Sequence, residues 1–157
     1  RKWRPRRDFG CCAAAGDEGE GFLIYIVGGC AQTGLLGDVW ASEDGGASWV
    51  CMCRDSDSPW DARAAPSLCA VPGRPDHLLL AGGIADYAEV CRDAWVSSDA
   101  GYSWTQLDQP VWSHATGRYR SALLPLPHEA GDRRDECRML LLGGCFIDGH
   151  DDSYLLE

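Results

Sequence analysis

The chain has 157 residues, of which 45% are hydrophobic and 24% are charged, and its formal net charge at pH 7 is −10. That charge argues against nucleic acid as a partner, because binding to a phosphate backbone requires a positive surface. Its longest continuous apolar run has the length of one strand, so the sequence predicts no transmembrane segment. The hydrophobic content is sufficient for a folded core.

The positive charges are concentrated at the start of the chain. Residues 1–8 carry a net charge of +4, whereas residues 9–157 carry −14. This basic start could contact an acidic protein, an anionic lipid surface or RNA. We favour the simpler interpretation that these residues are solvated side chains leading into the first strand.

Short apolar segments of four to seven residues, bounded by Gly, Pro, Asp or Ser, follow one another along the chain. Such segments are typical of strands, and none has the length or the 3.6-residue period of a helix. In chain order the predicted strands are 10–15, 22–27, 38–42 and 48–52, then 67–71, 77–80, 93–97 and 103–107, and finally 121–126, 138–142 and 152–156.

These strands belong to a repeat with a period of about 55 residues. The pattern S-x-D-x-G-x-S-W occurs at 42–49 and again at 97–104. A fixed period of this length indicates a repeat architecture. Further features recur in phase: the glycine pairs at 28–29, 82–83 and 143–144, the pattern of Asp38 and Trp40 at Asp93 and Trp95 and more faintly at Asp152 and Tyr154, and the arginines Arg7, Arg63 and Arg118.

The repeated pattern predicts a tight turn between the third and fourth strands of each unit. An aspartate in a turn accepts hydrogen bonds from nearby backbone amides, glycine supplies a positive φ, and tryptophan packs as a large apolar group. We therefore expect purely structural roles for Ser42, Asp44, Gly46 and Trp49, and for Ser97, Asp99, Gly101 and Trp104.

This pattern resembles the Asp-box found in sialidases and many other β-propellers. The glycine pair followed by aromatic residues resembles the kelch repeat, although the nine-residue separation of Trp40 and Trp49 exceeds the usual kelch spacing. The resemblance implies an all-β fold, a kelch-like propeller of four-stranded blades. The expected blade units are 7–62, 63–117 and 118–157, the last incomplete. Because propellers close with about four to eight blades, we expect further blades or chains to complete the ring.

Several of the nine cysteines fall inside predicted strands, where a free thiol behaves as a small apolar residue. Their odd number and position favour reduced thiols and hence a reducing compartment. Cys51 and Cys53 form the one Cys-x-Cys pair, and no Cys-x-x-Cys spacing typical of zinc ligands occurs. The sequence therefore predicts neither a metal site nor a cofactor.

The function that these features favour is a non-catalytic scaffold for protein–protein interaction, as a subunit or part of a larger assembly. A carbohydrate-binding or sialidase-like glycoside hydrolase is the main alternative, and a purely structural segment is a third. In sialidases an arginine cluster binds the substrate carboxylate. Arg7, Arg63 and Arg118 superficially match that cluster, but their spacing indicates residues that start each unit, and no pair of catalytic carboxylates stands out.

Binding residues of a scaffold are expected in the loops that differ between units. The loop 127–137 is about twice as long as its counterparts, and the loop 145–151 is rich in polar residues. The candidate interaction residues are Arg133, Arg134, Asp135 and Glu136 in the first loop and Asp148, His150 and Asp151 in the second.

Overall fold

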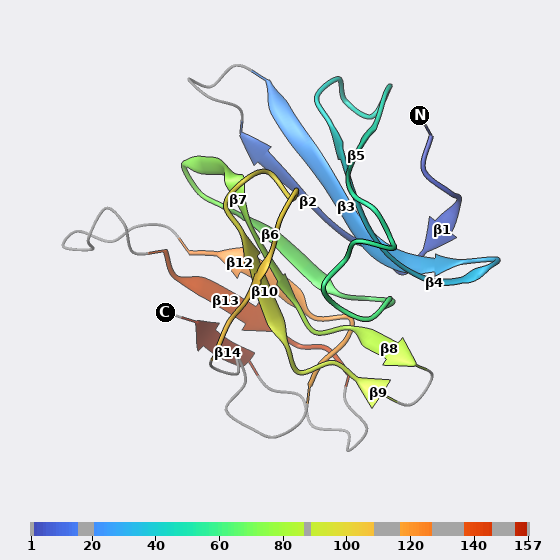
Figure 1. Cartoon of the computed structure of the whole chain (residues 1–157). Helices are drawn as coiled ribbons and strands as arrows, with labels where there is room; N and C mark the ends of the chain where they lie inside the picture. The colour runs from blue at the N-terminus through green and yellow to red at the C-terminus, as the bar shows by residue number, and fades with distance from the viewer. Residues whose placement is uncertain are drawn as a thin grey trace.

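The computed structural model describes residues 2–15, 21–86, 89–108, 117–126, 137–145 and 153–156. Every regular element in these ranges is a β-strand, and every pairing between strands is antiparallel (Figure 1). The chain is therefore an all-β protein, as the sequence predicts. The described strands form several separate sheets and no closed barrel.

The first sheet follows the chain directly. Its four main strands are β2 (Gly10–Ala15), β3 (Phe22–Ala31), β4 (Gly34–Ser42) and β5 (Val50–Cys53). The short strand β1 (Arg6–Arg7) pairs with the far end of β3, beyond the residues that pair with β2. We call strands β2 to β5 unit 1.

The second and third sheets repeat this order. Unit 2 consists of β6 (Ser67–Val71), β7 (Arg74–Ala81), β10 (Ala94–Ser97) and β11 (Thr105–Gln106), and unit 3 consists of β12 (Ala122–Pro125), β13 (Met139–Leu142) and β14 (Ser153–Leu156). The hairpin of β8 (Ile84–Asp86) and β9 (Glu89–Val90) lies between β7 and β10 in the chain and forms its own small sheet.

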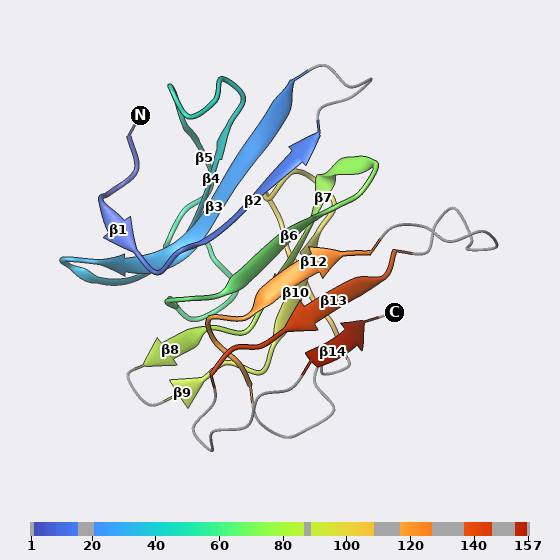
Figure 2. The same ribbon diagram turned by 180° about the vertical axis from the view of Figure 1, so that it is seen from behind.

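The first strands of the three units, β2, β6 and β12, lie side by side in the middle of the molecule (Figure 2). The other strands of each unit extend away from them. Several successive strands are joined by links such as 32–33, 72–73 and 98–104, which are shorter than the crossover that a parallel pair requires.

Two hydrophobic cores lie between neighbouring units, one between units 1 and 2 and the other between units 2 and 3, so unit 2 contributes to both. Successive side chains of a strand point to opposite faces of its sheet. In β7, accordingly, Leu78 and Leu80 lie in the core against unit 1, while Leu79 and Ala81 lie in the core against unit 3. Unit 1 supplies residues such as Tyr25 and Val27 to the first core, and unit 3 supplies Leu123, Met139 and Leu141 to the second.

Apart from strand bounds, such as the start of β4 at Gly34 and not at 38, three features of the fold differ from the sequence prediction. In unit 1 the second strand does not end at the glycine pair, because β3 continues to Ala31 through a register shift between Val27 and Gly29. Gly28 and Gly29 have φ values of 60° and 102°, which glycine adopts without steric cost. The other two differences are strand β1 and the β8–β9 hairpin, which the repeat pattern did not indicate.

Candidate functional site

The first hairpin, residues 42–49, is held together by its own side chains. The Asp44 carboxylate accepts hydrogen bonds from the Ser42 hydroxyl at 2.9 Å, from the Ser48 amide at 2.8 Å and from the Ser48 hydroxyl at 2.6 Å. The Ser42 Oγ accepts the Gly46 amide at 2.8 Å, and the Trp49 indole donates to the Gly46 carbonyl at 3.0 Å.

The second hairpin, residues 97–104, repeats these contacts one for one. The Asp99 carboxylate accepts the Ser97 hydroxyl at 2.8 Å, the Ser103 amide at 2.9 Å and the Ser103 hydroxyl. Gly101 donates to Ser97 Oγ at 2.9 Å and accepts the Trp104 indole at 3.1 Å. Every residue that the two copies of the pattern share therefore takes part in the hydrogen bonds of its own turn.

These bonds favour the ionised carboxylates. Hydrogen bonds from the Ser48 hydroxyl and amide lower the pKa of Asp44 from 3.8 to about 2. Desolvation raises the pKa of Asp99, but the hydrogen bonds from Ser103 and Ser97 outweigh it, so that the pKa of Asp99 is also lowered. Both aspartates are thus engaged acceptors within their turns.

A second repeated constellation joins an arginine, an aspartate and a tryptophan. Arg6 donates both Nη atoms to the Asp38 carboxylate, at 2.5 and 3.0 Å, and Nη1 also donates to the Gly28 carbonyl at 2.8 Å. Trp40 Nε1 donates to the same carboxylate at 2.7 Å. This bidentate geometry is the strong form of an arginine–carboxylate pair.

Unit 2 contains the same constellation in Arg63, Asp93 and Trp95. The two Nη atoms of Arg63 lie 2.5 and 2.8 Å from the Asp93 oxygens, Nη1 lies 3.0 Å from the Gly82 carbonyl, and the Trp95 indole donates to Asp93 at 2.7 Å. Desolvation raises the pKa of Asp93, but Arg63 more than compensates and the pKa is lowered. The Arg63 side chain is 2% exposed.

The arginine that starts unit 1 is Arg6, not Arg7 as the sequence spacing predicted. The Arg7 side chain is 78% exposed and lies 3.6 Å from Asp8. The prediction was wrong by one residue because β1 places Arg6 toward Asp38. Arg118, in unit 3, is buried and donates to the Gly143 carbonyl at 3.3 Å, matching the contacts of Arg6 with Gly28 and of Arg63 with Gly82.

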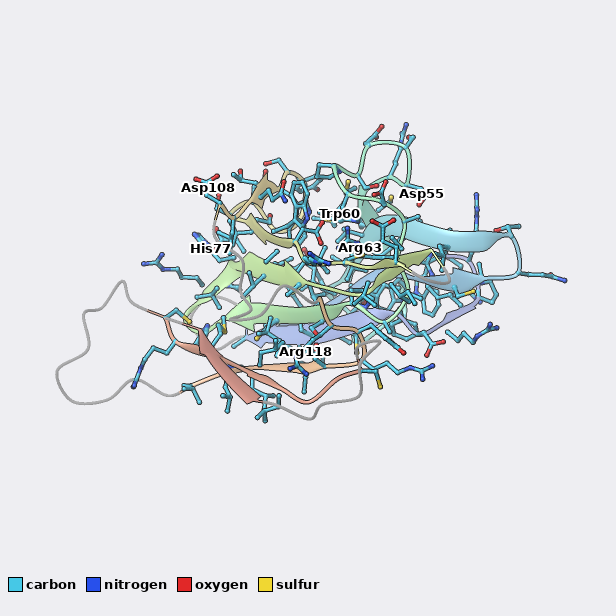
Figure 3. The ribbon with its side chains drawn as sticks, turned by 90° about the horizontal axis from the view of Figure 1, so that it is seen from below. Asp55, Trp60, Arg63, His77, Asp108 and Arg118 are labelled. Atoms are coloured by element: carbon cyan, nitrogen blue, oxygen red, sulfur yellow. The ribbon has the colours of Figure 1, made fainter. Side chains whose placement is uncertain are left out.

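A further repeat, which the sequence analysis did not predict, consists of two tryptophans. Trp3 and Trp60 each lie three residues before the arginine of their unit, Arg6 and Arg63. Trp3 makes an edge contact with Trp49 at a centroid distance of 5.8 Å, and Trp60 makes one with Trp104 at 5.0 Å. Trp60 also meets Trp95 at 5.6 Å. The pattern W-x-x-R was the signal that could have revealed them. Figure 3 shows Trp60 and Arg63 in the interior between the sheets.

The units are joined by backbone hydrogen bonds at equivalent positions. The Ala65 amide donates to the Asp8 carbonyl at 2.6 Å, and the Arg120 amide donates to the Ala65 carbonyl at 3.0 Å. These three residues share left-handed φ values of 51°, 51° and 58°, which are uncommon outside glycine. Their side chains have nothing in common, so the sequence could not have indicated them.

A cleft of about 470 Å³ lies between the two hairpins. Leu23, Tyr25 and Met52 of unit 1 line it, together with Ala100 and Tyr102 of the second hairpin. Burial is the main cause that raises the pKa of Tyr25 to about 12, so its hydroxyl remains protonated and donates to the Pro75 carbonyl at 3.3 Å. Tyr102 is 59% exposed, as is the nearby Val50.

The rim of this cleft is acidic. Glu43 and Asp44 contribute carboxylates from the first hairpin, and Glu43 is exposed. The cleft thus combines an apolar floor, the exposed Tyr102 ring and the exposed Glu43 carboxylate at its rim.

The remaining predicted residues contribute less to this picture. All seven candidate loop residues, Arg133, Arg134, Asp135, Glu136, Asp148, His150 and Asp151, lie outside the described residues. None of the nine cysteines, all of which lie among the described residues, forms a disulfide, and burial raises the pKa of Cys53, Cys69 and Cys91 to about 11. Within the described ranges no group of three or more His, Cys, Asp or Glu side chains could hold a metal ion.

The described part of the chain contains no helix long and apolar enough to cross a membrane. Fold and contacts together define an all-β protein whose first two antiparallel units carry the same hairpin and the same arginine–aspartate–tryptophan constellation. No family model matches the chain, and no curated protein matches its sequence.

Proposed function

We propose that the chain is part of a kelch-like β-propeller with Asp-box hairpins and that it works as a non-catalytic platform for protein–protein interaction. The observation that carries this proposal is the repetition of one unit, with equivalent hairpin and arginine contacts in units 1 and 2 and with the first strands β2, β6 and β12 side by side. Blades arranged around an axis have this relation to one another.

The cleft between the hairpins is the proposed binding site. Its apolar floor can accept a hydrophobic side chain, and exposed aromatic residues such as Tyr102 are the residue type that contributes most at protein interfaces. The acidic rim at Glu43 favours a partner segment that places a basic residue beside the apolar one.

The hydrogen bonds of the buried arginines support a role as a scaffold and not as a glycosidase. Arg63 donates to Asp93 and the Gly82 carbonyl, and Arg118 donates to the Gly143 carbonyl, so these buried side chains serve contacts within the fold. An arginine cluster for a substrate carboxylate would need side chains that reach a cleft.

A peptide-display selection on the immobilised chain tests this function. We expect selected peptides to combine an apolar with a basic residue and to lose about tenfold or more in affinity when Tyr102→Ala removes the aromatic ring. Phe22→Ala is the matched control, because Phe22 is 52% exposed and lies outside the cleft.

Equal binding of the selected peptides to the wild-type chain and to Tyr102→Ala would contradict the assignment of the cleft. Hydrolysis of a fluorogenic sialoside or another aryl glycoside by the purified chain would contradict the non-catalytic role.

A further inference from the structure

Three of the side chains that differ between the two hairpins line the cleft between them. The variable positions of the pattern S-x-D-x-G-x-S-W hold Glu43, Gly45 and Ala47 in the first hairpin and Ser98, Ala100 and Tyr102 in the second. Of these, Glu43, Ala100 and Tyr102 contribute to the cleft. The side chains of Glu43 and Tyr102 take no part in the hydrogen bonds of their turns, which the shared residues make. The turn therefore does not require either side chain.

The wall of the cleft that carries Tyr102 is fixed against the rest of the fold. The Ala100 amide donates to the Asp76 carbonyl at 2.8 Å. Gly101 packs so closely against unit 1 that a β-carbon added there would lie 3.2 Å from Val39 Cγ1 and 3.8 Å from Met52 Cβ. The Tyr102 side chain itself is 59% exposed. A ring that is held in place but still exposed loses little conformational entropy when it binds a partner.

The charge of the cleft is negative. Its described lining residues include two carboxylates, those of Glu43 and Asp44, and no lysine, arginine or histidine. The Asp44 carboxylate accepts three hydrogen bonds within its turn, whereas Glu43 is exposed and lies outside those bonds. The cleft therefore offers the Glu43 carboxylate to a cation of the partner.

The apolar floor and the tyrosine decide which cation fits best. Leu23 and Met52 belong to the floor, and a lysine ammonium, which is strongly hydrated, would lose water there. A guanidinium is more weakly hydrated, stacks on aromatic faces and gives a carboxylate two parallel hydrogen bonds. The aliphatic stem of an arginine can also cover apolar surface. These properties favour arginine over lysine.

We infer that the cleft binds an arginine side chain of the partner in preference to a lysine. The guanidinium stacks on Tyr102 and pairs with Glu43, and the stem of the side chain covers Leu23 and Met52. The inference rests on the proposed function, because it specifies the residue that the proposed binding site recognises.

The two methionines of the chain provide a readout that is specific for the cleft. Met52 lines the cleft, whereas Met139 is 4% exposed in the core between units 2 and 3. The full chain, labelled with carbon-13 in its methionine methyl groups, is titrated by NMR with a tetrapeptide of glycine, leucine, arginine and glycine that is blocked at both ends. We expect the peptide to shift the Met52 signal and to leave the Met139 signal unchanged, and Met52→Leu assigns the two signals.

Peptides in which the arginine is replaced measure the preference. The lysine peptide is expected to bind at least about fivefold more weakly, because the stacking of the guanidinium is lost. The peptide with citrulline, which is the neutral isostere of arginine, is expected to bind at least about tenfold more weakly. The trimethyl-lysine peptide should also be weaker than the arginine peptide, since it cannot donate hydrogen bonds to Glu43.

Variants of the chain assign the preference to its two contacts. Glu43→Gln should remove most of the difference between the arginine and citrulline peptides. Glu89→Gln is the matched control, because Glu89 is also exposed but does not line the cleft, and it should retain the difference. Tyr102→Ala should weaken the arginine peptide by about fivefold or more, whereas Tyr102→Phe keeps the ring and should bind nearly as the wild type does.

Equal affinities of the arginine and lysine peptides, tighter binding of the trimethyl-lysine peptide, or equal effects of Glu43→Gln and Glu89→Gln would overturn the inference. Display-selected peptides that depend on Tyr102 but lack an arginine would also overturn it, and would leave the proposed function standing. If no selected peptide depends on Tyr102 and no peptide shifts the Met52 signal, the inference and the proposed binding site both fail.

Discussion

The two serines of each hairpin have different surroundings although they bind the same aspartate. Ser97 is 3% exposed, and its Oγ accepts the amide of the buried Gly101, whereas Ser103 lies on the surface. Water can replace the lost partner at an exposed position but not at a buried one. The inner serine is therefore the more important of the two for stability.

Ser97→Ala is expected to lower the free energy of unfolding by about 1–3 kcal/mol, because it leaves the buried Gly101 amide without an acceptor. Ser103→Ala is expected to cost well under half of that. Urea unfolding of both variants measures the difference. Equal losses for the two would show that burial does not decide the strength of the turn.

The hairpin aspartates predict how stability depends on pH. Since the pKa of Asp44 falls from 3.8 to about 2 on folding, and that of Asp99 is also lowered, their contribution is complete above about pH 4. It is then lost as the pH falls toward 2. Thermal unfolding between pH 2 and 7 is expected to show this loss, and the double variant Asp44→Asn and Asp99→Asn is expected to show a smaller one. Parallel curves would contradict the role of these carboxylates.

Trp60 is buried at 5% exposure between two tryptophans, and its Nε1 has no hydrogen-bond acceptor among the described residues. Its contribution therefore comes from packing. Trp60→Phe should cost much less than Trp60→Ala, for which we expect about 3–5 kcal/mol. Chemical denaturation compares them, and a phenylalanine variant as unstable as the alanine one would indicate a polar role for the indole.

At the scale of elements, the arginine–aspartate–tryptophan constellation fastens the segment before the first strand of a unit to the third strand. Arg63 precedes β6, and Asp93 and Trp95 flank the start of β10. The guanidinium also holds the Gly82 carbonyl at the end of β7. One side chain thereby connects three segments of unit 2.

Arg63→Met is expected to destabilise the fold by about 3–5 kcal/mol, because it leaves the Asp93 carboxylate partly buried without its cation. Arg7→Met is the control and should have little effect, since that side chain is 78% exposed. Thermal melts of both variants also test the register of the repeat. Equal losses of melting temperature for the two variants would indicate that Arg7, and not Arg6, is the residue of unit 1 equivalent to Arg63.

Much of this element structure was predictable from the sequence, because local rules determine it. Short runs of small apolar residues bounded by turn residues predicted β2 and β6 at their observed bounds, and the repeated hairpin letters predicted two turns with a common function. The hairpins needed no information from distant parts of the chain.

The missed features depend on tertiary contacts. Arg6 and Arg7 cannot be told apart until β1 pairs with β3, and Asp8, Ala65 and Arg120 are equivalent through backbone conformation rather than side chain. The cleft also escaped prediction, because its lining comes from two units that are distant in sequence.

At the scale of the whole molecule, the two outer faces of the described sheets have the same residue pattern as the faces that form the two cores. Within the chain the junction between units is repeated, since the Ala65 amide donates to the Asp8 carbonyl and the Arg120 amide donates to the Ala65 carbonyl.

The central claim is that equivalent units pack around a shared axis through one repeated junction. A crystal structure of the full chain tests it most directly. We predict that Arg6 and Arg63 each bind their aspartate through both Nη atoms, that the amides of Ala65 and Arg120 donate to the preceding unit, and that β2, β6 and β12 surround one axis. Sheets stacked face to face without a common axis, or arginines directed into solvent, would contradict the account.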